Sequence, residues 1–166
     1  EAIDQMPDWL EVLRKSIFYD IVGFKEETTG VLLQMFAGVS LIREGLQKRG
    51  NFHILLVGDA GTCKSTLLKL VYEFAPKSYF VSGPAVTAAG LTGSAVRDEL
   101  LGVYTLEAGP IVLANNGILC IDEMDKADPK HVGALHEPLE NETVSLAKGG
   151  ITATMICRTA VLAAAN

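Results

Sequence analysis

The side chains best placed for chemistry form a short run of small and polar residues over positions 58–65, with the sequence GDAGTCKS. An apolar segment, 53–57, precedes this run, and a segment with helical character begins at about Lys64. A loop that joins a strand to a helix N-terminus can turn its backbone N–H groups toward phosphate oxygens, and small side chains allow the close approach. The expected phosphate-binding set is Gly58, Asp59, Ala60, Gly61, Thr62, Cys63, Lys64, Ser65 and Thr66.

Lys64 and Ser65 give this loop the expected chemistry of a Walker A motif, which binds ATP and Mg²⁺. The ammonium group of Lys64 would reach the β- and γ-phosphates, and the Ser65 hydroxyl would bind Mg²⁺. Cys63 departs from the pattern G-x-x-x-x-G-K-[ST], because it stands where that pattern has its second glycine. It is either a small residue that fits the loop, which we favour, or a reactive thiol at a helix N-terminus. The alternative for the whole run is an ordinary strand–turn–helix connection.

A second candidate motif is the acidic pair Asp122-Glu123, which ends the apolar run 118–121. This arrangement is typical of a Walker B strand, in which Asp122 would hold Mg²⁺ and Glu123 would act as general base on the attacking water. Acids also end strands as plain solvated residues, so the pair gains its weight from the phosphate loop before it. A Glu directly after the Asp favours a hydrolase over a passive nucleotide binder. We interpret Asp125 and Asp128 as loop and helix-cap residues rather than metal ligands.

The elements that must position these motifs alternate between strands and helices, which indicates an α/β fold with a parallel sheet. Helices are predicted over residues 7–18, 25–39, 64–74, 87–95 and 128–140. Strands are predicted over residues 53–57, 79–82, 118–121, 143–146, 151–156 and 160–165. Residues 107–115 are predicted to be extended, and the polar stretch 43–51 to be a connector. The run 53–57 fits a strand buried on both faces, and residues 147–150, AKGG, fit a hairpin turn.

Composition and charge narrow the class of protein. A chain of 166 residues, 49% of them apolar, suits one domain with a buried core. Cys63, Cys120 and Cys157 form no C-x-x-C pair and are interpreted as reduced thiols. No apolar run reaches the ~18 residues of a membrane span, and no signal segment opens the chain, so we expect a soluble intracellular protein with no membrane partner. The net charge of −6 argues mildly against generic nucleic-acid binding.

Together with the sequence around them, these motifs resemble the AAA+ ATPase domain of the MCM (minichromosome maintenance) replicative helicases. The likeness is carried by the non-Gly residue Cys63 in the loop and by the stretches IDEMDK at 121–126, LHEPLE at 135–140, VSLAKGGITAT at 144–154 and RTAVLAAAN at 158–166. Shorter matches occur at 21–23, 32–36, 88–92, 96–99 and 106–109. The resemblance covers nearly the whole chain and is specific.

The resemblance implies a three-layer P-loop domain with a parallel central sheet and two inserted β-hairpins. One of these, the helix-2 insert, would span about Ala95 to Ala114, with its tip near Leu100 to Tyr104. The other, the presensor-1 hairpin, would carry Lys148 at its tip. The last sheet strand and the helical lid of the family would be missing.

The resemblance also implies an assembly and a set of further functional residues. MCM proteins act as homo- or hetero-hexamers with DNA in a central channel, where Lys148 would contact a DNA phosphate. Six copies that focus cations in one channel would let an acidic chain bind DNA. Asn166 resembles sensor 1, which hydrogen-bonds the γ-phosphate or the attacking water. The family's arginine finger and sensor 2 arginine follow sensor 1, so we expect the chain alone to bind nucleotide weakly and to hydrolyse it slowly or not at all.

By this likeness residues 1–166 form a partial ATPase domain, with a helical lead-in over about 1–50 and a nucleotide-binding core over 51–166. The first expected function is the ATPase module of a hexameric DNA helicase in replication, in the nucleus if the source is eukaryotic and in the cytoplasm if it is archaeal. The second is an AAA+ remodelling ATPase of the magnesium-chelatase or MoxR type, acting on proteins or cofactors. The AKGG turn at 147–150 and Cys63 favour the first. A third alternative, a non-catalytic subunit, is disfavoured by the intact loop and acidic pair.

Overall fold

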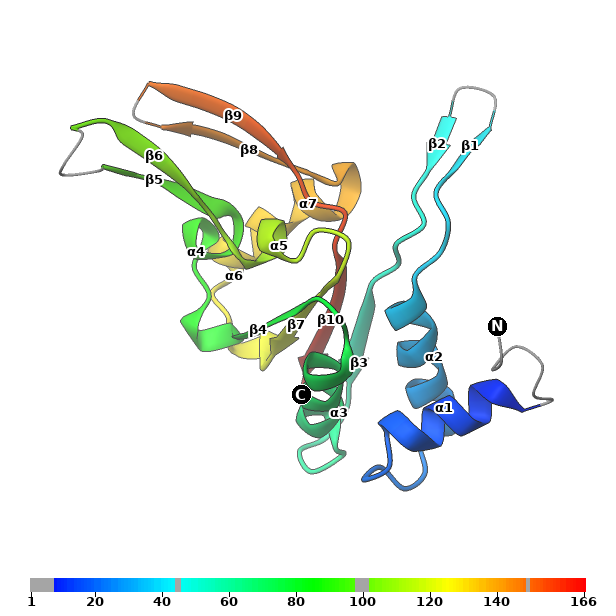
Figure 1. The fold of residues 1–166 in the computed structure, drawn as a ribbon. Helices are drawn as coiled ribbons and strands as arrows, with labels where there is room; N and C mark the ends of the chain where they lie inside the picture. Colours follow the sequence, from blue (N-terminus) through cyan, green and yellow to red (C-terminus); the bar gives the residue numbers. More distant parts are fainter. Residues whose placement is uncertain (1–7, 44–45, 98–101, 149) are drawn as a thin grey trace.

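In the part of the chain that the structure describes, a four-stranded parallel sheet forms the centre, in the order β3-β10-β7-β4 (Figure 1). Its strands are β3 (Ile54–Val57), β4 (Ser78–Ser82), β7 (Ile118–Asp122) and β10 (Ala160–Ala165). The computed structural model describes residues 8–43, 46–97, 102–148 and 150–166. Because β10 lies between β3 and β7, strands far apart in the chain become neighbours at the centre of the sheet.

Helices cover both faces of the sheet and give the domain three layers (Figure 1). One face carries α1 (Trp9–Ile17), α2 (Lys25–Phe36) and α3 (Lys64–Phe74). The other carries α4 (Ala88–Thr92), α5 (Pro110–Leu113), α6 (Pro129–Val132) and α7 (His136–Asn141), with short 3₁₀ turns η1 (Gly83–Ala85), η2 (Met124–Lys126) and η3 (Gly133–Leu135) between elements. The predicted α/β class is confirmed.

Strand β7 shows how the sheet builds two cores at once. Its side chains alternate, so Ile118 and Cys120 join the core beneath α1–α3, whereas Leu119 and Ile121 join the core beneath α4–α7. All four are buried. A strand covered on both faces must be apolar throughout, which is why this run carries no polar residue before Asp122.

Three antiparallel hairpins stand out from the layers within the described residues. They are β1 (Leu41–Arg43) with β2 (Leu46–Lys48), β5 (Gly93–Arg97) with β6 (Tyr104–Ala108), and β8 (Thr143–Lys148) with β9 (Ile151–Ile156). The last two hairpins lie side by side (Figure 1), and β5 contacts β8. Gly93 lies at this contact: a β-carbon there would lie 2.7 Å from the Glu107 carbonyl oxygen of β6 and 3.2 Å from Leu146 Cδ1 of β8.

These two hairpins overlap the segments expected to be inserts. Strands β5 and β6 fall within or beside the expected 95–114 segment, and β8 and β9 occupy the predicted strands around 147–150. Residues 100–101 of the expected helix-2-insert tip lie outside the described residues, as do residues 98–99 of the same insert and Gly149. Lys148 is not in the turn itself, because it still pairs with Ile151 as the last residue of β8.

Most of the predicted elements are confirmed within a few residues at their ends. The predicted helix 64–74 is α3, and the predicted strands 79–82, 118–121 and 160–165 are β4, β7 and β10. The helix predicted over 25–39 ends earlier, at Phe36, and the one predicted over 87–95 ends at Thr92, where β5 takes over. The helix predicted over 7–18 is α1, although its expected first residue lies outside the described residues.

Three predictions of local structure are wrong. The stretch 43–51 is not only a connector, because it contains β2 and the end of β1. The stretch 107–115 is not extended throughout: Pro110 begins the short helix α5, a position where its fixed φ suits a helix. The helix predicted over 128–140 is broken into α6, η3 and α7, and Pro138 has no N–H to continue a helical hydrogen-bond pattern.

Strand β3 corrects a fourth prediction, that residues 53–57 are buried on both faces. Ile54 and Leu56 pack against the core beneath α1–α3, but Leu55 and Val57 are 56% and 68% exposed. Among the described strands β3 pairs only with β10 and forms an edge of the sheet. An unbroken apolar run therefore did not indicate burial on both faces of β3.

Candidate functional site

The carboxyl ends of β3, β10 and β7 meet at one edge of the sheet. Val57 of β3 pairs with Ala165 of β10, and β10 is paired in parallel with β7 on its other side. The loop after β3, Asp122 at the end of β7 and Asn166 after β10 therefore leave the sheet close to one another. In open α/β sheets, ligands bind outside this carboxyl edge.

The loop between β3 and α3 turns through left-handed backbone at two positions. Gly61 has φ +83°, and Cys63, directly before α3, has φ +59°. Glycine adopts this conformation without strain, whereas a residue with a β-carbon does so at a cost of about 1 kcal/mol or more. The exposed Cys63 thus takes a backbone conformation that suits the glycine of the general Walker A pattern.

The ammonium group of Lys64 lies against the inside of this loop. Its Nζ donates to the carbonyl oxygens of Gly58 and Asp59, at 2.5 and 2.6 Å, and to Thr62 Oγ1 at 3.2 Å. The Thr62 hydroxyl in turn donates to the Asp59 carbonyl at 2.8 Å. A phosphate in the loop would offer charged acceptors in place of neutral carbonyls, and hydrogen bonds between charged partners are the stronger ones.

The acidic pair forms a tight turn at the end of β7. Asp122 Oδ1 accepts a hydrogen bond from the Glu123 N–H at 2.9 Å, and Glu123 itself has a left-handed φ of +52°. Glu123 Oε1 accepts from Lys126 Nζ at 2.5 Å, and this contact raises the pKa of Lys126. Gly83 makes room for the turn, because a β-carbon there would collide with the Glu123 carbonyl oxygen.

One cavity of about 250 Å³ brings most of the predicted site residues together. Its lining consists of Ala60, Gly61, Thr62, Cys63, Lys64, Ser65, Thr66, Asp122, Glu123, Asp125, Ala164, Ala165 and Asn166. Gly58 and Asp59 do not line it, and their carbonyls hold Lys64 instead. Lys148 belongs to a different part of the molecule, since β8 extends away from this edge of the sheet (Figure 1).

The residues predicted to bind Mg²⁺ fit an ion that arrives with a nucleotide. Ser65 and Asp122 line the same cavity. Among the residues that the structure describes, no group of three His, Cys, Asp or Glu side chains is arranged to hold a metal. Mg²⁺ commonly takes one or two protein oxygens and completes its shell with phosphates and water. One hydroxyl and one carboxylate on a shared cavity match that habit.

Asp125 is a cavity residue that we predicted only as part of a loop. Its Oδ1 accepts a hydrogen bond from the backbone N–H of Asn166 at 3.2 Å, which ties the end of β10 to the turn after β7. The helix cap predicted at Asp128 is confirmed, because its carboxylate accepts from the Lys130 N–H at the start of α6.

A second cavity of about 230 Å³ adjoins the first and shares Thr62, Cys63 and Lys64 with it. Its remaining lining is mostly apolar and comprises Ile21, Phe24, Glu27, Leu55, Leu56, Val57 and Leu67. We did not predict this cavity, because its walls come from segments far apart in the sequence. The one signal in the sequence is the glycine before Phe24. In the structure this residue, Gly23, has a left-handed φ of +83°.

The two remaining cysteines have no place in the site. Cys120 and Cys157 are buried and unbridged. Burial raises the pKa of Cys120 to about 12 and that of Cys157 to about 11, so both stay protonated at neutral pH. Within the described ranges, no helix combines the length and the apolar character needed to cross a membrane.

A glycine-containing loop between β3 and α3 that shares a cavity with the acidic end of β7 defines a P-loop domain. A family model, the MCM P-loop domain, matches residues 1–166. The chain belongs to this family, and the resemblance noted in its motifs is confirmed.

Curated relatives show the same family. DNA replication licensing factor Mcm6 of Anopheles gambiae is 45% identical over 161 residues, which cover 96% of this chain and 20% of the relative. The proteins of the same name from Drosophila melanogaster and Schizosaccharomyces pombe are each 46% identical over 155 residues, which cover 93% of this chain and 19% and 17% of the relative. The chain therefore spans about one fifth of the length of the curated relatives that it matches.

Proposed function

We propose that this chain is the ATP-binding and hydrolysing module of a hexameric DNA helicase that acts in DNA replication in the nucleus. The observation that carries the proposal is the shared cavity, which Lys64, Ser65, Asp122, Glu123 and Asn166 line together. These are the types of side chain that phosphoryl transfer to water requires. The relatives, named DNA replication licensing factors, support the link to replication.

The two adjoining cavities would hold the two ends of ATP. The triphosphate would lie in the first, where Lys64 exchanges its loop carbonyls for phosphate oxygens and the start of α3 offers free N–H groups. The base would lie in the second, whose wall includes the aromatic ring of Phe24 and the aliphatic side chains of Ile21 and Leu56. A flat heteroaromatic base gains from such contacts.

Hydrolysis would use the acidic pair from the side of β7. Bound Mg²⁺, held by Ser65 and Asp122, would neutralise charge on the β- and γ-phosphates. Glu123 would accept a proton from the attacking water as its oxygen bonds to the γ-phosphorus and the bond to ADP breaks. Asn166 would orient the water or the γ-phosphate. Because Lys126 occupies Oε1 of Glu123, the second carboxylate oxygen is the one free to take the proton.

DNA would bind at the paired hairpins rather than over the whole surface. The net charge is −6, so any affinity for phosphate must be local. Hairpins β5–β6 and β8–β9 project together away from the ATP site (Figure 1). Arg97 is exposed at the end of β5, and Lys148 ends β8. In a ring of subunits, these ends would face a common channel.

The test uses the chain within its full-length protein and its hexamer, and measures ATP hydrolysis and salt-sensitive binding of single-stranded DNA. Glu123→Gln should lower hydrolysis by about 100-fold or more while ATP still binds. Lys148→Ala should weaken DNA binding without loss of ATP binding. Lys69→Ala, which removes an exposed charge from α3, serves as the matched control.

Two outcomes would contradict the proposal. If Glu123→Gln hydrolysed ATP at the full rate, Glu123 would not be the general base. Absence of DNA binding by every assembled form, with ATP hydrolysis intact, would favour the magnesium-chelatase or MoxR type of remodelling ATPase.

A further inference from the structure

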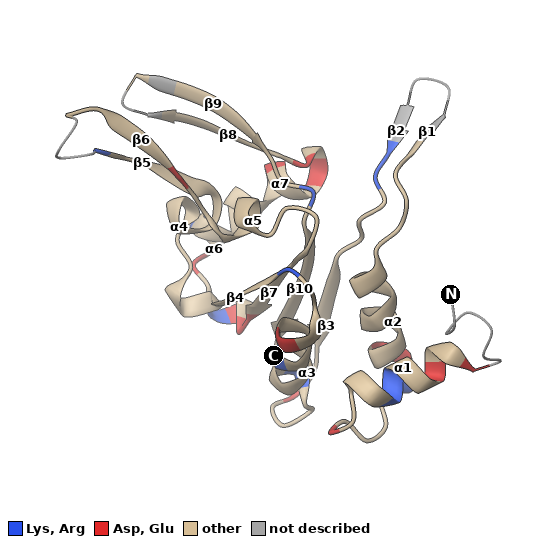
Figure 2. Ribbon diagram, viewed as in Figure 1, with Lys and Arg blue, Asp and Glu red and all other residues tan. Residues whose placement is uncertain are grey.

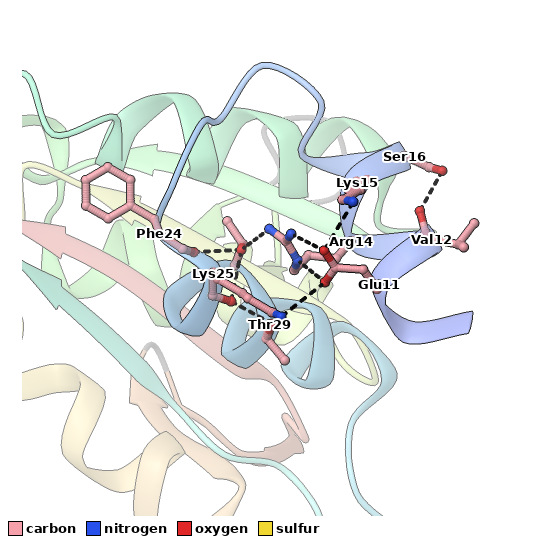
Figure 3. Close-up of polar contacts among 9 residues, drawn as sticks. Glu11, Val12, Arg14, Lys15, Ser16, Phe24, Lys25 and Thr29 are labelled. Atoms are coloured by element: carbon pink, nitrogen blue, oxygen red, sulfur yellow. Dashed lines mark hydrogen bonds and ion pairs between the residues drawn. The ribbon is translucent and has the colours of Figure 1, made fainter. Parts of the chain in front are cut away.

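Helices α1 and α2 are joined by a partly buried polar contact of Glu11, Arg14 and Thr28, called here the α1–α2 clip. Arg14 Nε and Nη2 donate to the two carboxylate oxygens of Glu11 at 3.0 and 2.8 Å, and Arg14 Nη1 donates to Thr28 Oγ1 at 3.1 Å. Figure 3 shows the Arg14 guanidinium between Glu11 and the start of α2. Arg14 is 9% exposed and Thr28 is 0% exposed.

The clip is charged at neutral pH. The hydrogen bond from Arg14 lowers the pKa of the Glu11 carboxyl to about 2. Lys15 and Lys25 lie 3.5 and 3.9 Å from the same carboxylate. An ionised Glu11 fixes the planar guanidinium by two parallel bonds, which leaves the third nitrogen directed at Thr28.

The clip ends on the backbone of Phe24. The backbone N–H of Thr28 and its side-chain hydroxyl both donate to the Phe24 carbonyl oxygen, at 2.9 and 2.7 Å. Phe24 has φ +47° and ψ +44°, and it follows Gly23, which also has a positive φ. A bulky residue takes left-handed backbone only where its surroundings hold it there. The hydrogen bond from the Thr28 hydroxyl to the Phe24 carbonyl oxygen stabilises this conformation of Phe24.

The conformation of Phe24 decides what its ring lines. The ring points away from the clip (Figure 3), and Phe24 forms part of the second cavity with Ile21 and with Cys63 of the phosphate loop. Arg14 and Thr28 line neither of the two cavities beside the loop. The hydrogen bonds from Thr28 to the Phe24 carbonyl oxygen connect them to the wall of the second cavity.

We propose that Thr28, held by Arg14, is a positioning residue for the base of the bound nucleotide, because it fixes Phe24 in the conformation that forms the wall of the second cavity. The inference rests on the proposed ATP site. It assigns the clip to recognition of the base alone, since the triphosphate is held by the loop at 58–65. A probe with phosphates and no base should not depend on the clip.

The experiment compares magnesium ATP with magnesium tripolyphosphate, both titrated by calorimetry into the full-length protein that contains this chain. Thr28→Val has almost the same shape but cannot donate to Phe24 or accept from Arg14. It should weaken ATP binding about fivefold, the effect of one net hydrogen bond, and leave tripolyphosphate binding unchanged. Thr28→Ser keeps the hydroxyl and should restore ATP binding to within about twofold.

Arg14→Met gives a second route to the same answer, because it removes the donor that orients Thr28 and leaves Thr28 in place. It should weaken ATP binding in the same direction and spare tripolyphosphate. Equal weakening of both probes would show general damage to the domain and overturn the inference, as would Thr28→Val binding ATP as tightly as the unvaried chain. A full-length protein without substitutions that binds neither probe would instead contradict the proposed ATP site itself.

Discussion

Cys63 lines both cavities, so its side chain would lie close to both the triphosphate and the base of the proposed ATP. Its left-handed backbone stores a small strain that the glycine of the general pattern would not. The exposed thiol also stands apart from Cys120 and Cys157, which are buried. A thiol reagent therefore has one accessible target among the three cysteines of the chain.

Alkylation of Cys63 with iodoacetamide should lower ATP affinity at least about tenfold, because the added group would fill space that both cavities share. Cys63→Ala should bind ATP much as the unvaried chain does, since we favour a small residue that merely fits the loop. Cys120 and Cys157 should stay unlabelled in the folded chain at neutral pH, because their thiols are protonated and buried. Mass spectrometry locates the label, and fluorescent ATP measures the affinity. Unchanged affinity after complete labelling would rule out this account.

At the scale of elements, the parts that could be predicted are those whose own residues carry the signal. Helix α3 lies between a phosphate loop and Pro76, and β7 is an unbroken apolar run before two acids. The β1–β2 hairpin gave no such signal, and its first residue, Leu41, is 62% exposed. The phosphate loop and acidic pair were likewise contiguous in the sequence. The second cavity and the α1–α2 clip were not, because only the fold brings their segments together.

Gly83 shows how one element depends on another, since it lets η1 pass directly over the turn that holds the acidic pair. Gly83→Ala should lower the free energy of unfolding by about 1–3 kcal/mol, the usual effect of forcing extra volume into a filled site. Urea denaturation followed by circular dichroism measures it. Gly133→Ala is the control, because a β-carbon there meets nothing within 4 Å, and it should be neutral or slightly stabilising. Equal stability of the two variants would argue against this contact.

At the scale of the whole molecule, the acidic side chains of the first cavity and the projecting hairpins lie on different sides of the sheet. The acids that line the first cavity lie at the carboxyl edge of the sheet, whereas the β5–β6 and β8–β9 hairpins leave from its other side (Figures 1 and 2). The α1–α2 clip ties the N-terminal helices together next to the second cavity. Its ionisation is therefore expected to influence the stability of the entire domain.

The clip predicts how stability changes in acid. Glu11 has a pKa of about 2 in the folded chain against 4.5 as its ordinary value, so its contribution is complete above about pH 4.5 and is lost as the pH falls toward 2. Glu11→Gln should lower the urea midpoint at neutral pH and flatten the dependence on pH in this window. Glu26→Gln, at the start of α2 and in none of the ion pairs that the structure describes, is the control. Parallel pH profiles for Glu11→Gln and the unvaried chain would contradict the prediction.

Strand β10 has a consequence for motion. It begins just after β9. There the Cys157 N–H donates to the Glu142 carbonyl oxygen, and the Thr159 hydroxyl donates to the Ile111 carbonyl oxygen. The other end of β10 lies at the first cavity. Hydrogen bonds to β3 and β7 clamp it on both sides, and a one-residue slip would turn its buried side chains to the wrong face. We therefore expect β10 to move only together with β3 and β7, as one rigid sheet.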